Sequence, residues 1–352
     1  MLDKRFIGLA LTGLRSNLGR LKLPYKLTFA VTYRCQSRCL TCNIWKMRPD
    51  NELNIDEIVR FVQKNPYFKW ITITGGEPFL RSDIVDIART LYENSKGLYI
   101  ITMPTNSLCD TKTETDRIER ILQTGIPKLA ITLSLDGYRE LHDKIRGIPG
   151  NYEKVIRLYK ELAELKKRYN NLFFEFGYTM SNYNQGQLER TYEEVRRDLP
   201  DVTRNNFHLN LGQISEVYYK NSAENIKANG EATAKEIEEF ISKRKFRGDV
   251  ISVLEGAFLK KLVTFARTGK NPMKSRSLDV SLFMDSFGDV YPSIMWNKKI
   301  GNIREHDYEL AGLWRSSAAD EIRKNIENGN EPNSWTACEA YQCLTGRMSS
   351  LI

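Results

Sequence analysis

Apolar segments of strand length alternate with amphipathic helical segments between residues 26 and 211. The expected strands cover residues 26–32, 69–74, 98–103, 129–135, 172–179 and 207–211. The helices expected between them cover residues 54–64, 82–94, 113–124, 151–169 and 188–197. Strands that each precede a helix pair in parallel through right-handed crossovers, so the sequence predicts a parallel sheet covered by helices. In such sheets the functional loops follow the carboxyl ends of the strands.

The remaining pattern divides the chain into four segments. We expect an N-terminal amphipathic helix in 1–24, a barrel core in 25–215, a helical insert in 216–270 and a C-terminal extension in 271–352. The predicted fold class is α/β, a partial (β/α)6 TIM-like barrel with a small α+β extension. In the insert, residues 222–247 are charged and predicted to be helical, and residues 250–267 are expected to form a second, more apolar helix. In the extension, the strands expected at 282–285 and 290–292 flank a turn sequence, which predicts a hairpin.

The N-terminal helix is expected over residues 2–21 and to stop before Pro24. Its apolar residues recur near the helical period, namely Leu2, Phe6, Leu9, Leu14, Leu18 and Leu21. One interpretation is that this face packs on the outside of the barrel. The other is that the helix makes reversible contact with a membrane surface.

Composition narrows the classes of function. Hydrophobic residues make up 41% and charged residues 28% of the 352 residues, which is ordinary for a soluble protein. No stretch approaches the roughly 20 apolar residues of a membrane span, and no secretory leader is recognisable, so we expect a cytoplasmic protein. The formal net charge of +9 is spread among alternating basic and acidic residues. The absence of a dedicated basic stripe argues against specific nucleic-acid binding, whereas an acidic protein partner fits the charge.

Three of the six cysteines, Cys35, Cys39 and Cys42, lie within eight residues directly after the first expected strand. Six cysteines are too few for a disulfide scaffold, and their clustering favours metal binding. Thiolates bind soft metals, and three of them suit three irons of a cubane cluster, which leaves the fourth iron open. Zinc is the alternative, but it needs a fourth ligand, and His142 and Cys109 are distant in the sequence.

The loop Cys35-Gln-Ser-Arg-Cys39-Leu-Thr-Cys42 resembles the signature of the radical S-adenosylmethionine superfamily. The resemblance implies a 4Fe-4S cluster on the three cysteines, with S-adenosylmethionine chelating the open iron. It also implies reductive cleavage to methionine and a 5′-deoxyadenosyl radical. In that family the residue before the third cysteine is usually aromatic and contacts the adenine, whereas this chain has Thr41.

Further motifs fall at the ends of the next expected strands. Gly75, Gly76, Glu77 and Pro78 follow the second strand. Glycine permits close approach of a ligand to the backbone, and a carboxylate accepts hydrogen bonds from an ammonium group. Alone, this string is also compatible with a turn that precedes a helix. At this distance from Cys42 it resembles the family motif that binds the amino group of the methionine moiety.

The third and fourth strands end in polar residues that the resemblance places around the cofactor. Asn106 lies in a turn similar to one that lines the cofactor pocket in the family. Ser134 and Asp136 are expected to bind the ribose hydroxyls, and an ordinary Asp-Gly turn is the alternative. His142 begins a stretch that resembles the H-D-x-x-R-G motif of some members. Arg146 in that stretch is expected to pair with the cofactor carboxylate as a fork.

The C-terminal extension resembles the SPASM or shortened twitch extension of the same superfamily, in which extra cysteines hold auxiliary clusters. Most of those cysteines are missing here, where the corresponding places hold 272–275, Ser293, Glu331 and Ser334. Only Cys338 and Cys343 remain, and serine is a poor ligand for a soft metal. We therefore expect the fold of the extension without its auxiliary cluster. The alternative is a cluster on Cys338 and Cys343 completed by Cys109 or by other ligands.

The resemblance implies a radical enzyme that takes hydrogen from an unidentified substrate, which is a peptide or protein, a carbohydrate, a lipid-linked molecule or a metabolite. A flavodoxin or ferredoxin is the expected electron donor, because such acidic proteins fit a basic surface. Two other functions stay open at this stage. One is a non-catalytic Fe–S or zinc-binding recognition module, and the other is a radical enzyme that modifies nucleic acid.

Overall fold

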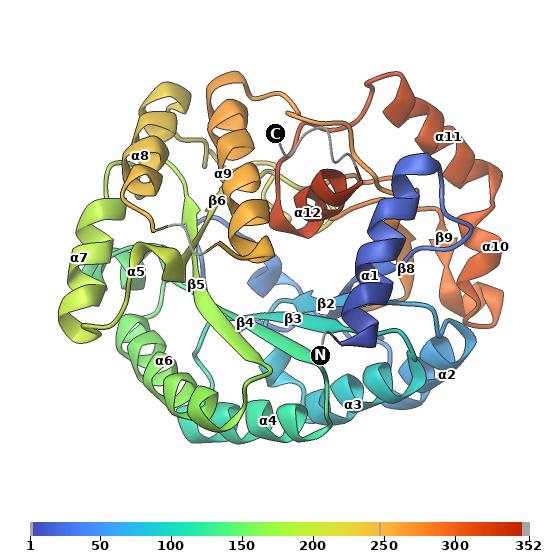
Figure 1. Cartoon of the computed structure of the whole chain (residues 1–352), viewed down its shortest axis with the longest axis horizontal. Helices are drawn as coiled ribbons and strands as arrows, with labels where there is room; N and C mark the ends of the chain where they lie inside the picture. The colour runs from blue at the N-terminus through green and yellow to red at the C-terminus, as the bar shows by residue number, and fades with distance from the viewer. Residues whose placement is uncertain (1–2, 246–247, 347–352) are drawn as a thin grey trace.

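A single mixed sheet organises the computed structural model, which describes residues 3–245 and 248–346 (Figure 1). Within the described residues the strand order is β6-β5-β4-β3-β2-β1-β7-β8-β9. The strands are β1 (Lys26–Thr32), β2 (Trp70–Gly75), β3 (Ile100–Thr105), β4 (Lys128–Ser134), β5 (Leu172–Met180), β6 (Phe207–Leu211), β7 (Ser281–Met284), β8 (Asp289–Tyr291) and β9 (Gly301–Asn302). Strands β1 to β6 pair in parallel as the sequence predicts, and the ladder between β6 and β9 is open.

The helices of the described residues lie on the outside of this sheet and across its cavity. They are α1 (Lys4–Arg15), α2 (Ile55–Lys64), α3 (Ile84–Asn94), α4 (Thr111–Gln123), α5 (Arg139–Arg146), α6 (Asn151–Arg168), α7 (Leu188–Asp198), α8 (Gly230–Ser242), α9 (Val250–Thr268), α10 (Leu310–Trp314), α11 (Ser317–Glu327) and α12 (Ala337–Thr345). Figure 1 shows α2, α3, α4 and α6 side by side along the convex face. This arrangement confirms the predicted α/β class, with a partial barrel in place of a closed one.

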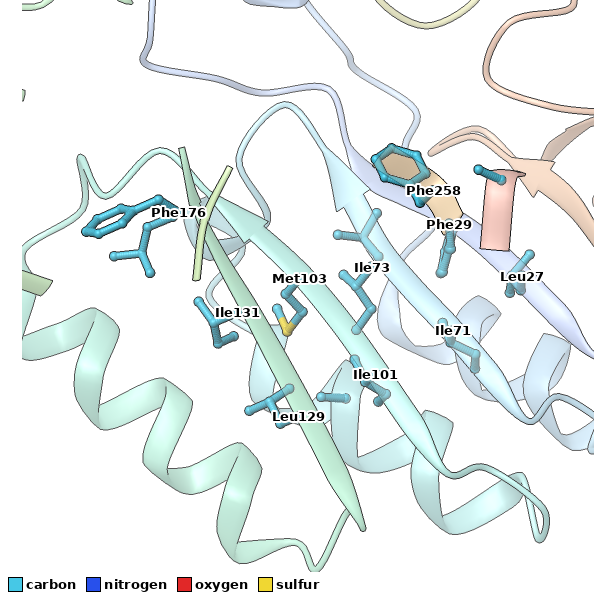
Figure 2. Close-up of a cluster of buried hydrophobic side chains, with 14 of the residues drawn as sticks. Leu27, Phe29, Ile71, Ile73, Ile101, Met103, Leu129, Ile131, Phe176 and Phe258 are labelled. Atoms are coloured by element: carbon cyan, nitrogen blue, oxygen red, sulfur yellow. The ribbon is translucent and has the colours of Figure 1, made fainter. Parts of the chain in front are cut away.

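The core follows from the two-residue alternation of the strands. Side chains on the convex side are aliphatic or aromatic and fully buried, for example Leu27, Ile73, Ile101 and Leu129. Figure 2 shows these residues of neighbouring strands in one continuous cluster. The alternate positions face the concave side, where Thr, Ser, Gly, Glu and His residues line the cavity together with apolar Trp and Ala residues. The same alternation therefore supplies both the core and the cavity wall.

The predicted hairpin is present, and it extends the sheet of the core. Strands β7 and β8 are antiparallel, and β7 pairs in parallel with β1 from Lys26↔Ser281 to Phe29↔Met284. The predicted core and extension thus share one hydrogen-bonded sheet. The four segment boundaries inferred from the sequence stay a prediction.

Two helical predictions need correction, and one helix was missed. Helix α1 ends at Arg15 and is followed by one 3-10 turn, Ser16–Leu18. The helix does not continue because the Arg276 guanidinium donates to the Ser16 carbonyl at 2.6 Å. Residues 222–229 are not helical; the Ile226 carbonyl accepts from the Asn182 backbone N–H at 3.1 Å, which ties this segment to the loop after β5. Helix α5 was not predicted from the sequence. No helix of the described residues has the length and apolar character needed to cross a bilayer.

Candidate active site

A cavity of about 360 Å³ opens at the carboxyl ends of the parallel strands. Its wall comes from β2 to β6, its rim from the cysteine loop after β1, and one side from α12. Among the residues predicted to bind the cluster or the cofactor, those that line it are Cys35, Cys39, Thr41, Cys42, Gly75, Gly76, Glu77, Asn106, Ser134, Asp136 and Arg146. Pro78 is buried at the start of the 3-10 turn Pro78–Leu80 and does not line the cavity. The structure therefore brings together residues from the carboxyl ends of β1, β2, β3 and β4 and from helix α5.

The cysteine loop is held on two sides by backbone contacts. On one side, the Glu77 N–H donates to the carbonyl of Arg34, the residue before Cys35, at 2.9 Å. A Cβ built on Gly76 would lie 2.4 Å from the Arg34 carbonyl oxygen, so only glycine permits this approach. On the other side, the Arg38 N–H donates to the Arg146 carbonyl at 2.9 Å. The loop is thus fixed between β2 and α5.

The thiols in this loop are surrounded by hydrogen-bond donors. The Arg146 guanidinium lies 3.6 Å from the Cys39 sulfur, and the Ser37 hydroxyl lies 3.1 Å from the same atom. The Asn106 amide donates to the Cys35 sulfur at 3.7 Å. Burial raises the pKa of Cys35 and of Cys42 to about 12, so these thiolates need a bound cation to form at neutral pH.

The donor set fits an iron–sulfur cluster. Three soft thiolates come from one short loop, and N–H donors near the sulfurs are a known way to stabilise such clusters. In the described part of the chain, no three His, Cys, Asp or Glu side chains converge to hold a single metal ion. A cubane distributes its ligands over separate irons, which is compatible with that finding. The three cysteines as cluster ligands stay a prediction.

The Glu77 carboxylate lines the cavity and also accepts hydrogen bonds from the protein backbone. One carboxylate oxygen accepts from the Asn106 backbone N–H at 2.7 Å and the other from Phe79 N–H at 3.1 Å. Burial, with the nearby charge of Glu114, raises the pKa of Glu77 to about 8. Its oxygens keep further lone pairs, so the predicted contact with an ammonium group is stereochemically open.

Asp136 and Arg146 form an ion pair beneath the loop, with Arg146 Nε 2.8 Å from Asp136 Oδ2. The other oxygen of Asp136 accepts from the Thr179 N–H at 3.1 Å. His142 Nδ1 accepts from the Asp136 backbone N–H at 3.1 Å, and burial lowers the pKa of His142 to about 3. Arg146 therefore lies between a carboxylate and a cysteine sulfur, which places it near the predicted cofactor but already paired.

Thr41 and Ser134 both line the cavity. The Thr41 carbonyl accepts from the Asn221 side chain at 2.9 Å, which ties the cysteine loop to the insert. Ser134 is half-buried at the last position of β4. Their predicted contacts with adenine and ribose stay predictions.

The sequence reasoning missed the polar floor of the cavity, where the insert and the extension meet the barrel. His208 on β6 lines the cavity, and its Nδ1 lies 3.2 Å from the Glu255 carboxylate on α9. Arg244 Nη1 lies 3.3 Å from the same carboxylate, and the Tyr341 hydroxyl donates to it. Glu175 on β5 also lines the cavity. The alternation in Phe-His-Leu-Asn-Leu was the available signal, because it places His208 and Asn210 on the concave face.

Oppositely charged side chains pair at this floor. Although burial opposes ionisation, the charges of His208 and Arg244 lower the pKa of Glu255 to about 2. Burial likewise opposes protonation of His208, but the Glu255 carboxylate raises the pKa of that histidine. No described group bonds the second ring nitrogen, Nε2, although it is buried. The floor therefore contains a buried ring nitrogen with unused hydrogen-bonding capacity.

The two C-terminal cysteines lie in different cavities. Cys338 lines the main cavity on α12. Cys343 lines a separate cavity of about 20 Å³ in the extension. Four positions that the resemblance associates with missing cysteines line this small cavity, namely Ser275, Ser293, Glu331 and Ser334. These positions therefore converge in space, around a volume suited to about one water molecule.

This geometry defines a class of protein. It is a parallel α/β barrel with a cysteine loop at the rim of its cavity. Residues 29–195 match the model of the Radical SAM superfamily. The part of the chain that this model covers therefore belongs to that superfamily, whose members use a 4Fe-4S cluster and S-adenosylmethionine.

Curated relatives agree with the family and cover part of the chain. The AdoMet-dependent heme synthase of Methanosarcina barkeri is 27% identical over 191 residues, which is 53% of this chain and 51% of that protein. The GTP 3′,8-cyclase of Limosilactobacillus fermentum is 33% identical over 135 residues, 36% of this chain and 38% of that protein. The chain thus spans about half the length of the first relative and less of the second.

Solved structures share the fold over most of the chain. Streptococcus suis SuiB bound to S-adenosylmethionine has a TM-score of 0.61 at 16% identity, over 91% of this chain and 72% of that one. The anSMEcpe enzyme with bound AdoMet and a peptide has a TM-score of 0.58 at 17% identity, over 86% of this chain and 84% of that one. Because the likeness to SuiB covers 91% of this chain, it extends beyond residues 29–195 and into the C-terminal extension.

Proposed function

We propose that this chain is a radical S-adenosylmethionine enzyme that cleaves S-adenosylmethionine reductively and takes hydrogen from a substrate bound in the same cavity. The observation that carries the proposal is the convergence of Cys35, Cys39 and Cys42 with Gly76 and Arg146 around one cavity. When bound there, the cluster and S-adenosylmethionine would supply the 5′-deoxyadenosyl radical.

The protein's own residues would position the reactants. The three thiolates would hold the cluster at the rim, while Gly75 and Gly76 leave room for the backbone to approach the cofactor. Arg146 would place positive charge beside Cys39 and the cofactor carboxylate. Ser134 and Asn106 on the neighbouring strand ends would bind polar groups of the cofactor.

The cavity floor is the proposed substrate end. His208 and Glu175 face the cavity there, and Glu255 and Arg244 of the insert lie behind His208. We infer that the insert shapes the choice of substrate. The candidates are a peptide or protein, a carbohydrate, a lipid-linked molecule and a metabolite; SuiB has been solved with a precursor peptide, which supports the first.

We further propose that an acidic flavodoxin or ferredoxin donates the electron, because the chain carries a formal charge of +9. All six cysteines are free thiols. Free thiols and a labile cluster suit the reducing cytoplasm, where we place the reaction.

The test is reductive cleavage of S-adenosylmethionine by the anaerobically reconstituted, dithionite-reduced chain. We expect 5′-deoxyadenosine and methionine in equal amounts, and loss of both products in Cys39→Ala. Cys343→Ala is the matched control, because it removes a buried thiol outside the main cavity. Bound iron without cleavage would favour a non-catalytic module. Cleavage by a Cys39→Ala chain with a verified empty site would contradict the proposal.

A further inference from the structure

Helix α1 and the 3-10 turn after it present an apolar stripe to solvent. The exposed fractions are 41% for Ile7, 48% for Leu11, 45% for Leu14 and 91% for Leu18. These residues are three or four positions apart, so they lie on one side of the helix. Exposed leucines scattered singly need no explanation, but an aligned row of four marks an interaction surface.

The opposite side of α1 is fixed to the rest of the molecule. The Phe6 ring packs on Tyr99 with centroids 5.3 Å apart, and the Lys69 ammonium donates to the Gly8 carbonyl at 3.3 Å. At the other end, the Asn17 amide donates to the Thr345 carbonyl of α12 at 3.2 Å. Figure 1 shows α1 on the outside of the molecule beside α12. Because these contacts hold the inner face, the apolar stripe stays turned outward.

The segment that carries this stripe is mostly basic. Residues 3–24 contain five basic residues, namely Lys4, Arg5, Arg15, Arg20 and Lys22. The acidic residue in this range is Asp3, and its carboxylate caps the helix through the Arg5 N–H. Arg20 pairs with Asp320 at 2.8 Å, while Lys4, Arg15 and Lys22 are exposed beside the stripe. A protein partner that covered this face would need both an apolar and an acidic surface, and an anionic bilayer offers both.

We propose that α1 and Ser16–Leu18 form the docking face for a membrane surface that contains anionic phospholipid. The leucine and isoleucine side chains enter the boundary between headgroups and acyl chains, and the flanking basic side chains pair with lipid phosphates. The helix lies on the membrane and does not cross it, in agreement with its length. With four apolar residues the attachment is reversible.

The test is co-sedimentation of the full chain with vesicles. One set contains phosphatidylcholine and phosphatidylglycerol, and the other phosphatidylcholine alone. We expect binding to the anionic vesicles and its loss at high salt. Leu11→Gln with Leu14→Gln, and separately Arg15→Gln with Lys22→Gln, should each weaken binding about tenfold or more. All four side chains are exposed, so thermal unfolding should be unchanged.

A matched control comes from the other exposed apolar group of the described residues, at the start of α9. Val250→Gln with Ile251→Gln changes two side chains that are 62% and 49% exposed and should leave vesicle binding within about twofold. Equal binding by the Leu11/Leu14 variant would overturn the proposal, as would no binding at low salt. A dimer in solution that the Leu11/Leu14 variant dissociates would also overturn it, because a second copy would then cover the stripe.

Discussion

Single glycines decide how closely the cysteine loop approaches β2 and α5. A Cβ on Gly75 would lie 2.0 Å from the Thr32 carbonyl oxygen, and one on Gly147 would lie 2.6 Å from the Arg38 carbonyl oxygen. Both glycines also have positive φ values, of 135° and 68°. Gly76 differs, because its φ is not positive and its requirement is purely one of space. It is therefore the cleanest position at which to test the fit of the loop.

We predict that Gly76→Ala displaces the cysteine loop. The added Cβ would lie 2.4 Å from the Arg34 carbonyl oxygen and 2.9 Å from the Cys35 Cβ, distances at which backbone has to move. Overpacking of this kind costs about 1–3 kcal/mol of folding free energy. Iron per chain after anaerobic reconstitution and the rate of S-adenosylmethionine cleavage should both fall.

The control for this prediction is Gly312→Ala on α10, where an added Cβ meets no atom within 4 Å. Its iron content and its cleavage rate should equal those of the parent chain. An unchanged iron content in Gly76→Ala would show that the loop tolerates the displacement and would contradict the fit argued for Gly76.

At the scale of elements, α2 links the barrel to the extension through one carboxylate. Asn54 and Glu57 form a capping box at the start of this helix. Glu57 also accepts from Arg304 Nε at 2.7 Å and from the Tyr308 hydroxyl at 2.9 Å, both more than 240 residues away in the chain. Glu57 therefore caps the helix locally and also holds the distant extension, and the sequence did not reveal this second role.

The contact between Glu57 and Arg304 predicts that the stability of the fold depends on pH. The Arg304 hydrogen bond outweighs partial burial and lowers the pKa of Glu57 from 4.5 to about 2. A depressed carboxyl pKa stabilises the fold above the ordinary value and loses that effect as the pH falls from about 4.5 toward 2. Glu57→Gln, which keeps a capping-box residue, should cost about 1–2 kcal/mol at pH 7.

Urea unfolding of both chains across this range measures the effect. The difference between parent and Glu57→Gln should shrink as the pH falls below 4.5. Asp56→Asn is the control, because it removes an exposed charge from the same helical turn and so accounts for the helix dipole. A difference that stays constant down to pH 2 would rule out the Arg304 pair as its source.

Elements with a strong local signal were predictable, and elements set by distant contacts were not. Strand β1 has the predicted bounds, and α2 begins one residue after its predicted start, because alternation and capping are local properties. Helix α5 has only eight residues and is capped by Gly147 within the motif that contains Arg146, so it is too short to show a repeated pattern in the sequence. Residues 222–229 have a helical composition, but the contact between Ile226 and Asn182 decides their conformation.

For the whole molecule, the sequence predicted the rim of the cavity and missed its floor. The rim residues follow strands in recognisable motifs. The floor brings His208 of β6, Glu255 of α9 and Tyr341 of α12 together from three distant segments. Likewise, the parallel pairing of β7 with β1 joins the extension to the core sheet, and no local pattern around Ser281 encodes that partner.

The arrangement of the two C-terminal cysteines leads to a prediction about iron content. Cys338 lines the main cavity, while Cys343 lines the cavity of about 20 Å³ in the extension, together with serines in place of thiols. Two thiols that line different cavities cannot form a four-thiolate site, and the serines beside Cys343 are poor ligands for a soft metal. We therefore expect about four irons and four sulfides per reconstituted chain, the content of one cubane cluster. Cys338→Ala with Cys343→Ala should keep that content and Cys39→Ala should lose it. About eight irons in the parent chain, reduced to four in the double variant, would instead establish an auxiliary cluster on the extension.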